Sequence, residues 1–180
     1  MAERGTGNGG LNASPEEIAA ILRRYRTVVV VGLSTDPLKP SHQVARYLQS
    51  QGYRIIPVNP HCQEILGEKC FSSLKDVPKP VEVVDIFRQV AAIPGIVEEA
   101  IAVGAKVIWM QLGLEHFEAA ARARHAGLQV VMNRCPKMEY GKLSGEWAWV
   151  GGNSGVISSR KQTMHESGKV QSLGLGPKTY

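Results

Sequence analysis

A short polar loop near the start of the chain carries side chains that could hold an anion. Ser34 and Ser41 offer hydroxyl groups to phosphate oxygens, and Lys39 can place a cation beside them. Pro40 is one of two prolines that stiffen the loop. These residue types predict an anion-binding loop. The alternative is an ordinary connection in which Ser41 caps the next helix and Lys39 is solvated.

The segments on either side of the loop must position it. Residues 28–31 are four consecutive valines, which favours a strand covered on both faces in a parallel sheet, and Gly32 ends that strand. After the loop, Val44, Tyr47 and Leu48 recur at helical spacing, so one face of a helix can pack on the sheet. The first turn of such a helix has free N–H groups and partial positive charge, which attract an anion.

Two absences argue against an NAD-binding loop. The dinucleotide fingerprint needs three glycines, and only Gly32 is present. After a second strand over residues 53–58, Asn59 stands where an NAD domain normally has Asp or Glu for the ribose hydroxyl, and Pro60 follows it. Asn59 could also be an ordinary turn residue. Together these absences favour another phosphate-bearing ligand.

Strands and helices alternate along the rest of the chain. A leading helix begins with a capping box at Ser14 and continues to about Arg24. Strands are expected over residues 81–87, 106–112 and 128–132, with a short one near 69–71, and helices over 94–103 and 115–126. This alternation predicts an α/β fold with a doubly wound, mostly parallel sheet of five or six strands.

Several polar residues fall near the expected strand ends. Open α/β sheets bind ligands outside the carboxyl ends of their strands, so Arg88 could meet a phosphate; a surface salt bridge is the alternative. Gln111 and Gly113 reach the same edge, where the glycine either permits close backbone approach or simply ends the strand. Asp85 has no second acid near it in sequence, so we expect a paired or strand-end carboxylate rather than a catalytic one.

The formal net charge of +5 does not indicate a nucleic-acid binder. Residues 151–180 hold four basic side chains and one acidic one, so +3 of the total lies in this tail and the rest of the chain is nearly neutral. A groove-binding domain concentrates basic residues on one folded face. We therefore expect no specific nucleic-acid partner.

Length and composition predict one domain outside the membrane. No run approaches the roughly 20 apolar residues of a membrane span, and the first thirteen residues lack the apolar core of a secretory signal. Cys62, Cys70 and Cys135 form neither an even disulfide set nor a CxxC pair, which indicates a reducing compartment. The expectation is a cytoplasmic protein without a metal site.

Composition divides the chain into three parts. Residues 1–13 are predicted to be a disordered arm, residues 14–161 the folded α/β domain, and residues 162–180 a flexible basic tail. Within the domain, residues 147–161 begin with two tryptophans two positions apart, which suits an extended segment with one buried face. That segment could cover an edge strand or contact a second subunit, so a homodimer or another protein partner stays open.

Six segments resemble one family in their order and spacing. They are GLSTDPLKPS at 32–41, IPVNP at 56–60, VVDIFR at 83–88, KVIWMQLG at 106–113, VVMNRC at 130–135 and NSGVISSRK at 153–161. From about Ser14 to Lys161 the chain thus resembles the stand-alone CoA-binding domain family. Its members are small Rossmann-like proteins similar to the CoA-binding domain of succinyl-CoA synthetase α subunits.

The resemblance implies a nucleotide-binding site for coenzyme A. The residues that it places there are Gly32, Ser34, Lys39, Pro40 and Ser41 at the diphosphate and first helix, Asn59 and Pro60 beside the nucleotide, Phe87 and Arg88 along the ligand, Gln111 and Gly113 near the pantetheine path, and Asn133 and Cys135 after the last strand. Family members often carry an acid at the place of Asn133, so a charge-based role does not carry over. A bound CoA thiol could exchange with Cys135; a buried, inert thiol is the alternative.

The leading hypothesis is a protein that binds coenzyme A or an acyl-CoA without catalysing a reaction. The sequence shows no Ser/His/Asp grouping, and the phosphohistidine of the ligase α subunit lies on a domain outside the resemblance. One alternative is a CoA-handling subunit of an acyl-CoA ligase-type enzyme that needs a partner. An NAD(P)-binding redox module is the third, disfavoured by the single glycine and by Asn59.

Overall fold

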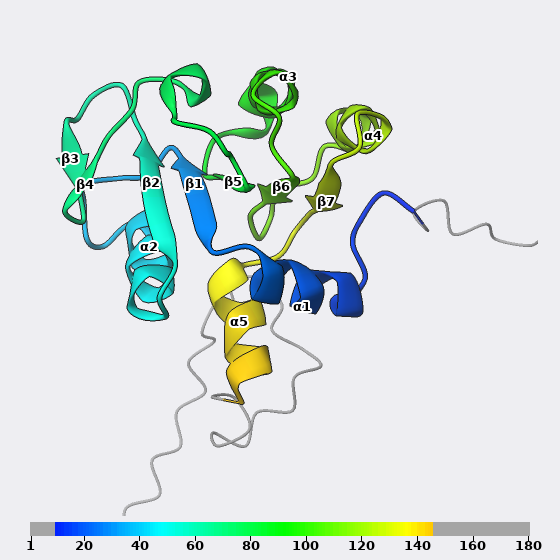
Figure 1. The fold of residues 1–180 in the computed structure, drawn as a ribbon, viewed down its shortest axis with the longest axis horizontal. Coiled ribbons are helices and arrows are strands. Elements are labelled where there is room, and N and C mark those ends of the chain that lie inside the picture. Colours follow the sequence, from blue (N-terminus) through cyan, green and yellow to red (C-terminus); the bar gives the residue numbers. More distant parts are fainter. Residues whose placement is uncertain (1–9, 146–180) are drawn as a thin grey trace, which may run out of the picture.

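A five-stranded parallel sheet forms the centre of the molecule, in the order β2-β1-β5-β6-β7 (Figure 1). The structure is a computed structural model that describes residues 10–145. The strands are β1 Thr27–Val31, β2 Arg54–Val58, β5 Val83–Ile86, β6 Val107–Met110 and β7 Gln129–Val131. β1 begins one residue before the predicted strand at 28–31, and each of the other four lies within a predicted strand and is shorter by one to three residues. The predicted α/β, doubly wound fold is confirmed.

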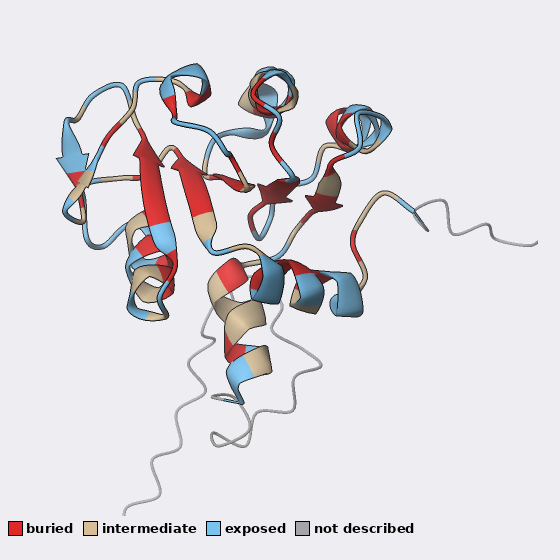
Figure 2. Ribbon diagram, in the orientation of Figure 1, coloured by how far each residue is buried: buried red, intermediate tan, exposed pale blue. Residues whose placement is uncertain are grey.

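The strands form where the sequence has β-branched residues because both faces of the sheet are covered. Val29 pairs with Ile56 on one side and with Val84 on the other, and all three side chains are buried. Figure 2 shows the central strands almost wholly in the colour of buried residues. Continuous apolar runs are what a doubly covered parallel sheet requires.

Helices cover both faces of the sheet, and two apolar clusters fill the layers between them. One face carries α1 Pro15–Arg24, α2 Pro40–Ser50 and α5 Pro136–Ser144; the other carries α3 Ile93–Ala102, α4 Phe117–His125 and the short helix η1 Leu74–Asp76 (Figure 1). The short helix η2 Val90–Ala92 directly precedes α3. The capping box predicted at Ser14 is present: its hydroxyl accepts from the Glu17 N–H, and the Glu17 carboxylate accepts from the Ser14 N–H.

Two features of the fold differ from the sequence prediction. No helix was predicted after the strand at 128–132, but α5 begins at Pro136, whose fixed φ suits the first turn of a helix. The crossover after β2 holds a small antiparallel hairpin of β3 Glu64–Ile65 and β4 Glu68–Lys69. The short strand expected at 69–71 thus ends earlier, and Phe71 makes an isolated parallel bridge with Val58.

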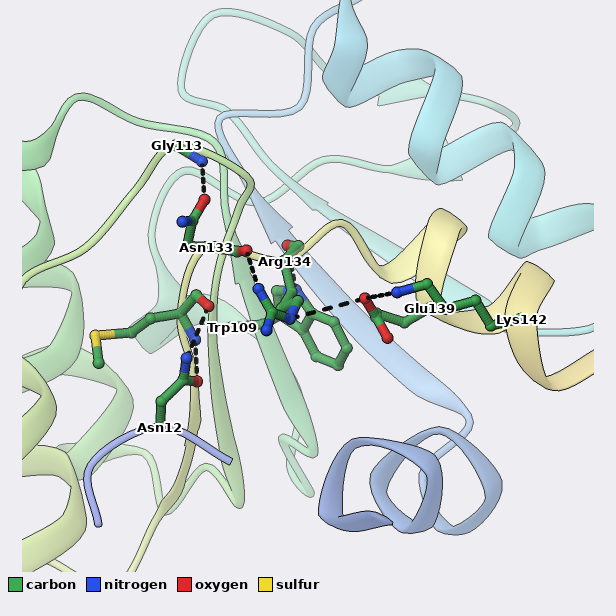
Figure 3. Close-up of polar contacts among 8 residues, drawn as sticks. Asn12, Trp109, Gly113, Asn133, Arg134, Glu139 and Lys142 are labelled. Atoms are coloured by element: carbon green, nitrogen blue, oxygen red, sulfur yellow. Dashed lines mark hydrogen bonds and ion pairs between the residues drawn. The ribbon is translucent and has the colours of Figure 1, made fainter. Parts of the chain in front are cut away.

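The fold begins ahead of Ser14. The Asn12 side chain pairs with the backbone of Met132: its Nδ2 donates to the carbonyl at 3.1 Å, and its Oδ1 accepts from the N–H at 2.8 Å (Figure 3). The Ala13 N–H donates to the Val130 carbonyl at 2.9 Å. This segment therefore occupies the free side of the edge strand β7.

The segment over residues 147–161 and the tail over 162–180 lie outside the described residues. Among residues 10–145, no helix has both the length and the apolar character needed to cross a bilayer.

Candidate functional site

The strand order places a ligand-binding position between β1 and β5. The chain runs outward from β1 to β2 and then returns to the opposite side of β1, so the direction of winding reverses there. In open α/β sheets ligands bind outside the strands' carboxyl ends at such a reversal. The side of the sheet where the strands end is called the carboxyl edge below.

Gly32 ends β1 at this reversal and lies against the chain that follows β5. Its φ is +85°, and a Cβ there would lie 2.5 Å from the Phe87 carbonyl oxygen and 2.7 Å from the Cδ of Arg88. The left-handed backbone and the lack of space both require glycine. Gly32 therefore brings the ends of β1 and β5 close together.

A cleft of about 250 Å³ opens beside Gly32. Four of its lining residues were predicted as site residues: Gly32, Asn59, Pro60 and Arg88. The rest of this edge cleft is formed by Val31, Val58, Ser72, Ser73, Leu74, Ala92, Ile96 and Glu99. It thus combines apolar walls with hydroxyl groups, one guanidinium and one carboxylate.

Asn59 uses its side chain to hold two loops together. Its Nδ2 donates to the Leu33 carbonyl at 2.9 Å, and its Oδ1 accepts from the His61 N–H at 2.9 Å. The second bond is the local turn that the sequence offered as the alternative role for this residue. Asn59 therefore shapes the wall of the edge cleft between β1 and β2.

Two cations stand at the carboxyl edge without an acidic partner. Arg88 and Lys39 are both exposed, and within residues 10–145 neither forms a salt bridge. The salt bridge considered for Arg88 is therefore absent from the described part of the chain. Both cations are available to an anionic ligand.

The loop between β1 and α2 is held by its own hydroxyl groups. Ser41 is buried, and its Oγ accepts from the Ser34 N–H at 3.1 Å, while the Nδ1 of His42 lies 2.9 Å from the Ser34 carbonyl oxygen. The N-cap of α2 is Lys39 rather than Ser41, and it makes no side-chain cap. No side chain thus caps the N–H groups of the first turn, which begins at Pro40.

The candidate residues after β6 and β7 contact one another. The Gly113 N–H donates to the Oδ1 of Asn133 at 2.7 Å (Figure 3). Asn133 has a φ of 54°, a left-handed conformation that asparagine tolerates better than most residues. Its amide therefore joins the ends of β6 and β7, a role that needs no charge.

Gln111 and Asp85 form a pair in the interior behind the edge. The Nε2 of Gln111 donates to the Oδ1 of Asp85 at 2.6 Å, and both residues are buried. The other carboxyl oxygen, Oδ2, is buried without a hydrogen-bond partner among the described residues. Burial raises the pKa of Asp85 to about 7. The carboxylate is thus paired, as expected.

Phe87 and Cys135 lie on the face of the sheet that α1, α2 and α5 cover. Both are half-buried and pack against the apolar cluster of that face. Burial raises the pKa of the Cys135 thiol, which lowers the fraction of reactive thiolate at neutral pH.

Part of the edge cleft was not predicted from the sequence. Ser72 and Ser73 reach it because Phe71 pairs with the end of β2, and Glu99 reaches it from α3. The Ser73 hydroxyl donates to the Oε2 of Glu99 at 3.2 Å. The small polar cluster after a predicted short strand was the only available hint, and it does not reveal where the loop returns.

The family model described as "CoA binding domain" matches residues 26–141. The chain belongs to this CoA-binding domain family. The match contains all five strands of the sheet and every residue of the edge cleft.

Known proteins extend this assignment. The uncharacterized protein YneT of Bacillus subtilis is 42% identical over 129 residues, which are 72% of this chain and 96% of that protein. A solved structure of a hypothetical protein from Pyrococcus horikoshii superposes with a TM-score of 0.72 and 41% identity, covering 75% of this chain and 95% of that one.

A larger enzyme contains a similar unit. The acetyl-coenzyme A synthetase 1 of Candidatus Korarchaeum cryptofilum, solved in its apo form, superposes with a TM-score of 0.54 and 29% identity. The similar region is 60% of this chain and 26% of the synthetase. The CoA-binding domain of this chain is therefore related to one part of that enzyme.

Proposed function

We propose that this protein binds coenzyme A or an acyl-CoA at the carboxyl edge and catalyses no reaction there. The observation that carries the proposal is the family match over residues 26–141, since it contains the reversal of strand order and the whole edge cleft.

The charges of the edge suit the phosphates of CoA. The diphosphate lies at the first turn of α2, where uncapped N–H groups and the helix dipole favour an anion, with Lys39 beside it. Arg88 contacts a phosphate from the other side of Gly32.

The size of the edge cleft suits one part of the ligand. Its volume of about 250 Å³ is below the roughly 300–1,000 Å³ of pockets that enclose a whole drug-sized ligand. We place the adenosine part in the cleft, against Asn59 and Pro60. The pantetheine arm then follows the carboxyl edge toward Gly113 and Asn133.

The chemistry of the described residues supports binding without catalysis. The Asn59 amide and the Ser73 hydroxyl are engaged in holding the walls of the cleft. Asp85 is fully buried, and burial raises the pKa of the Cys135 thiol. Within residues 10–145, no group of three or more His, Cys, Asp or Glu side chains is placed to hold a metal ion.

Calorimetric titration with CoA tests the proposal. The full-length protein should bind CoA with a dissociation constant well below millimolar. Arg88→Met should weaken binding about tenfold or more, because a hydrogen bond to a charged group contributes roughly 1.5–3 kcal/mol. Arg23→Met is the matched control, since Arg23 is an exposed cation on α1 outside the edge cleft, and its affinity should equal that of the wild type. CoA affinity no better than millimolar, together with tight binding of NAD, would refute the proposal.

A second candidate function is a CoA-handling subunit of a ligase-type enzyme. The similarity to 26% of the Korarchaeum synthetase favours it, because a CoA-binding unit occurs there as part of a larger catalyst. Such a subunit should co-purify with a nucleotide-binding partner and support CoA-dependent turnover. If the protein purified from its own cell lysate brings no such partner and shows no CoA-dependent turnover, the result would favour the first proposal, a CoA-binding protein without catalysis.

A further inference from the structure

Two cysteines face each other in the crossover after β2, where they pack against the apolar cluster under α1, α2 and α5. The Sγ atoms of Cys62 and Cys70 are 3.1 Å apart, although the residues are eight positions apart in the chain. The hairpin of β3 and β4 lies between them. The Cys70 N–H donates to the carbonyl of Gln63, the residue after Cys62, at 2.8 Å. The backbone of the hairpin therefore holds the two thiols in contact.

The separation is close to that of a covalent bond. A disulfide has an S–S length of roughly 2.05 Å, so the two sulfurs are only about 1 Å beyond it. Cys62 is half-buried and Cys70 is buried, so Cys62 is the thiol that a reagent in solution reaches first.

The pair is connected to both loop segments of the cleft wall. Cys62 follows Pro60 by two residues, and Cys70 precedes Ser72 by two. The backbones of these two loop segments are hydrogen-bonded to each other. The Phe71 N–H donates to the Pro57 carbonyl, and the Asn59 N–H donates to the Phe71 carbonyl, each at 2.9 Å. A bond between the sulfurs would join the loop after β2 covalently to the segment that follows β4.

We propose that Cys62 and Cys70 form a reversible dithiol–disulfide couple that is oxidised by a low-molecular-weight disulfide. The Cys62 thiolate attacks one sulfur of that disulfide, forming a mixed disulfide and releasing one thiolate, which takes up a proton. Cys70 then loses its proton and attacks the Sγ of Cys62, releasing the second thiol. Overall, two protein thiols are oxidised to one disulfide and the reagent is reduced to two thiols.

Intact mass and thiol alkylation of the full-length protein test the couple, with oxidised glutathione as the probe. The protein should lose the mass of two hydrogen atoms and stay monomeric on a non-reducing gel. The number of cysteines alkylated after denaturation should fall from three to one, and a dithiol reductant should restore it. Peptide mapping should show Cys62 joined to Cys70.

Two variants separate this pair from the third cysteine. Cys135→Ser should show the same loss of two hydrogen atoms as the wild type. Cys70→Ser should retain one glutathione in a mixed disulfide on Cys62, because no second thiol can release it. The proposal is overturned if all three thiols of the wild type stay alkylatable, if the disulfide involves Cys135, or if only linked dimers form. The mass measurement requires no bound CoA, so the outcome is independent of the proposed function.

Discussion

At Gly32 the chain that follows β1 lies directly against the chain that follows β5. An alanine Cβ would lie 2.5 Å from the Phe87 carbonyl oxygen, and the backbone would have to stay at a φ of +85°. We expect Gly32→Ala to lower the free energy of unfolding by about 2 kcal/mol or more, from the left-handed conformation and the clash together. Urea denaturation measures this loss.

Gly52→Ala is the control for Gly32→Ala. Gly52 has almost the same backbone, with a φ of +86°, but a Cβ there meets nothing within 4 Å. Its substitution should cost only the conformational part, about 1 kcal/mol. Equal losses in the two variants would show that contact with Phe87 and Arg88 does not restrict position 32.

The buried carboxyl group of Asp85 should make stability depend on pH. Burial raises its pKa from an ordinary 3.8 to about 7, so the folded protein holds this proton more tightly than the unfolded chain does. The resulting stabilisation is fully present below pH 3.8 and is lost as the pH rises to about 7. This difference in pKa between the folded and unfolded states corresponds to a change of at most roughly 4 kcal/mol in the free energy of unfolding. Urea denaturation across this range should show the decline.

Asp85→Asn should flatten this pH dependence. The amide oxygen can still accept from Gln111, and the side chain carries no ionisable proton. Asp76→Asn, at an exposed carboxylate, should leave the decline as in the wild type. An unchanged decline in Asp85→Asn would assign the pH dependence to other groups.

At the scale of elements, the edge strand β7 depends on the segment before α1. Asn12 makes two hydrogen bonds to the Met132 backbone, and each contributes roughly 0.5–1.5 kcal/mol. Asn12→Ala should therefore lower the free energy of unfolding by about 1–3 kcal/mol. It should also speed amide hydrogen exchange at Met132, measured by NMR.

Asn12→Asp tests whether both hydrogen bonds matter. The carboxylate keeps the acceptor for the Met132 N–H but loses the donor to its carbonyl. The amide hydrogen exchange rate of Met132 in Asn12→Asp should lie between the rates in the wild type and in Asn12→Ala. Wild-type exchange in both variants would mean that β7 is protected without this segment.

The elements themselves were predictable where hydrophobic periodicity was strong. The valines of β1 and the spacing of Val44 and Leu48 in α2 placed both elements, because burial against a common sheet imposes those patterns. α5 was missed because its buried residues are Pro136 and Gly141, which do not form an apolar stripe. Helix α5 is thus specified by packing more than by its own pattern.

The candidate site was predictable as an edge but not as a cleft. Strand ends give Gly32, Asn59 and Arg88, since parallel strands share one carboxyl edge. Which side chains turn inward depends on partners far away in sequence, as with Gln111, which bonds Asp85. The contribution of Ser73 and Glu99 depends on how the crossover folds back onto α3, and no local pattern encodes that return.

At the scale of the whole molecule, the strand order brings together the residues of the edge cleft, which lie far apart in the sequence. Asn59, Gly32 and Arg88 follow three neighbouring strands, β2, β1 and β5, so the cleft exists only when the central sheet is complete. A ligand that contacts all three loops therefore binds the folded state and not the unfolded chain. Binding and global stability are coupled by mass action.

This coupling predicts how CoA should change the unfolding of the protein. At a free CoA concentration 100 times the dissociation constant, the free energy of unfolding should rise by about 2.7 kcal/mol. At that same concentration, Arg88→Met with tenfold weaker binding should gain only about 1.4 kcal/mol, while Arg23→Met should match the wild type. Chemical denaturation with and without CoA measures all three gains. Equal gains for Arg88→Met and the wild type would mean that CoA binds this fold away from the reversal between β1 and β5.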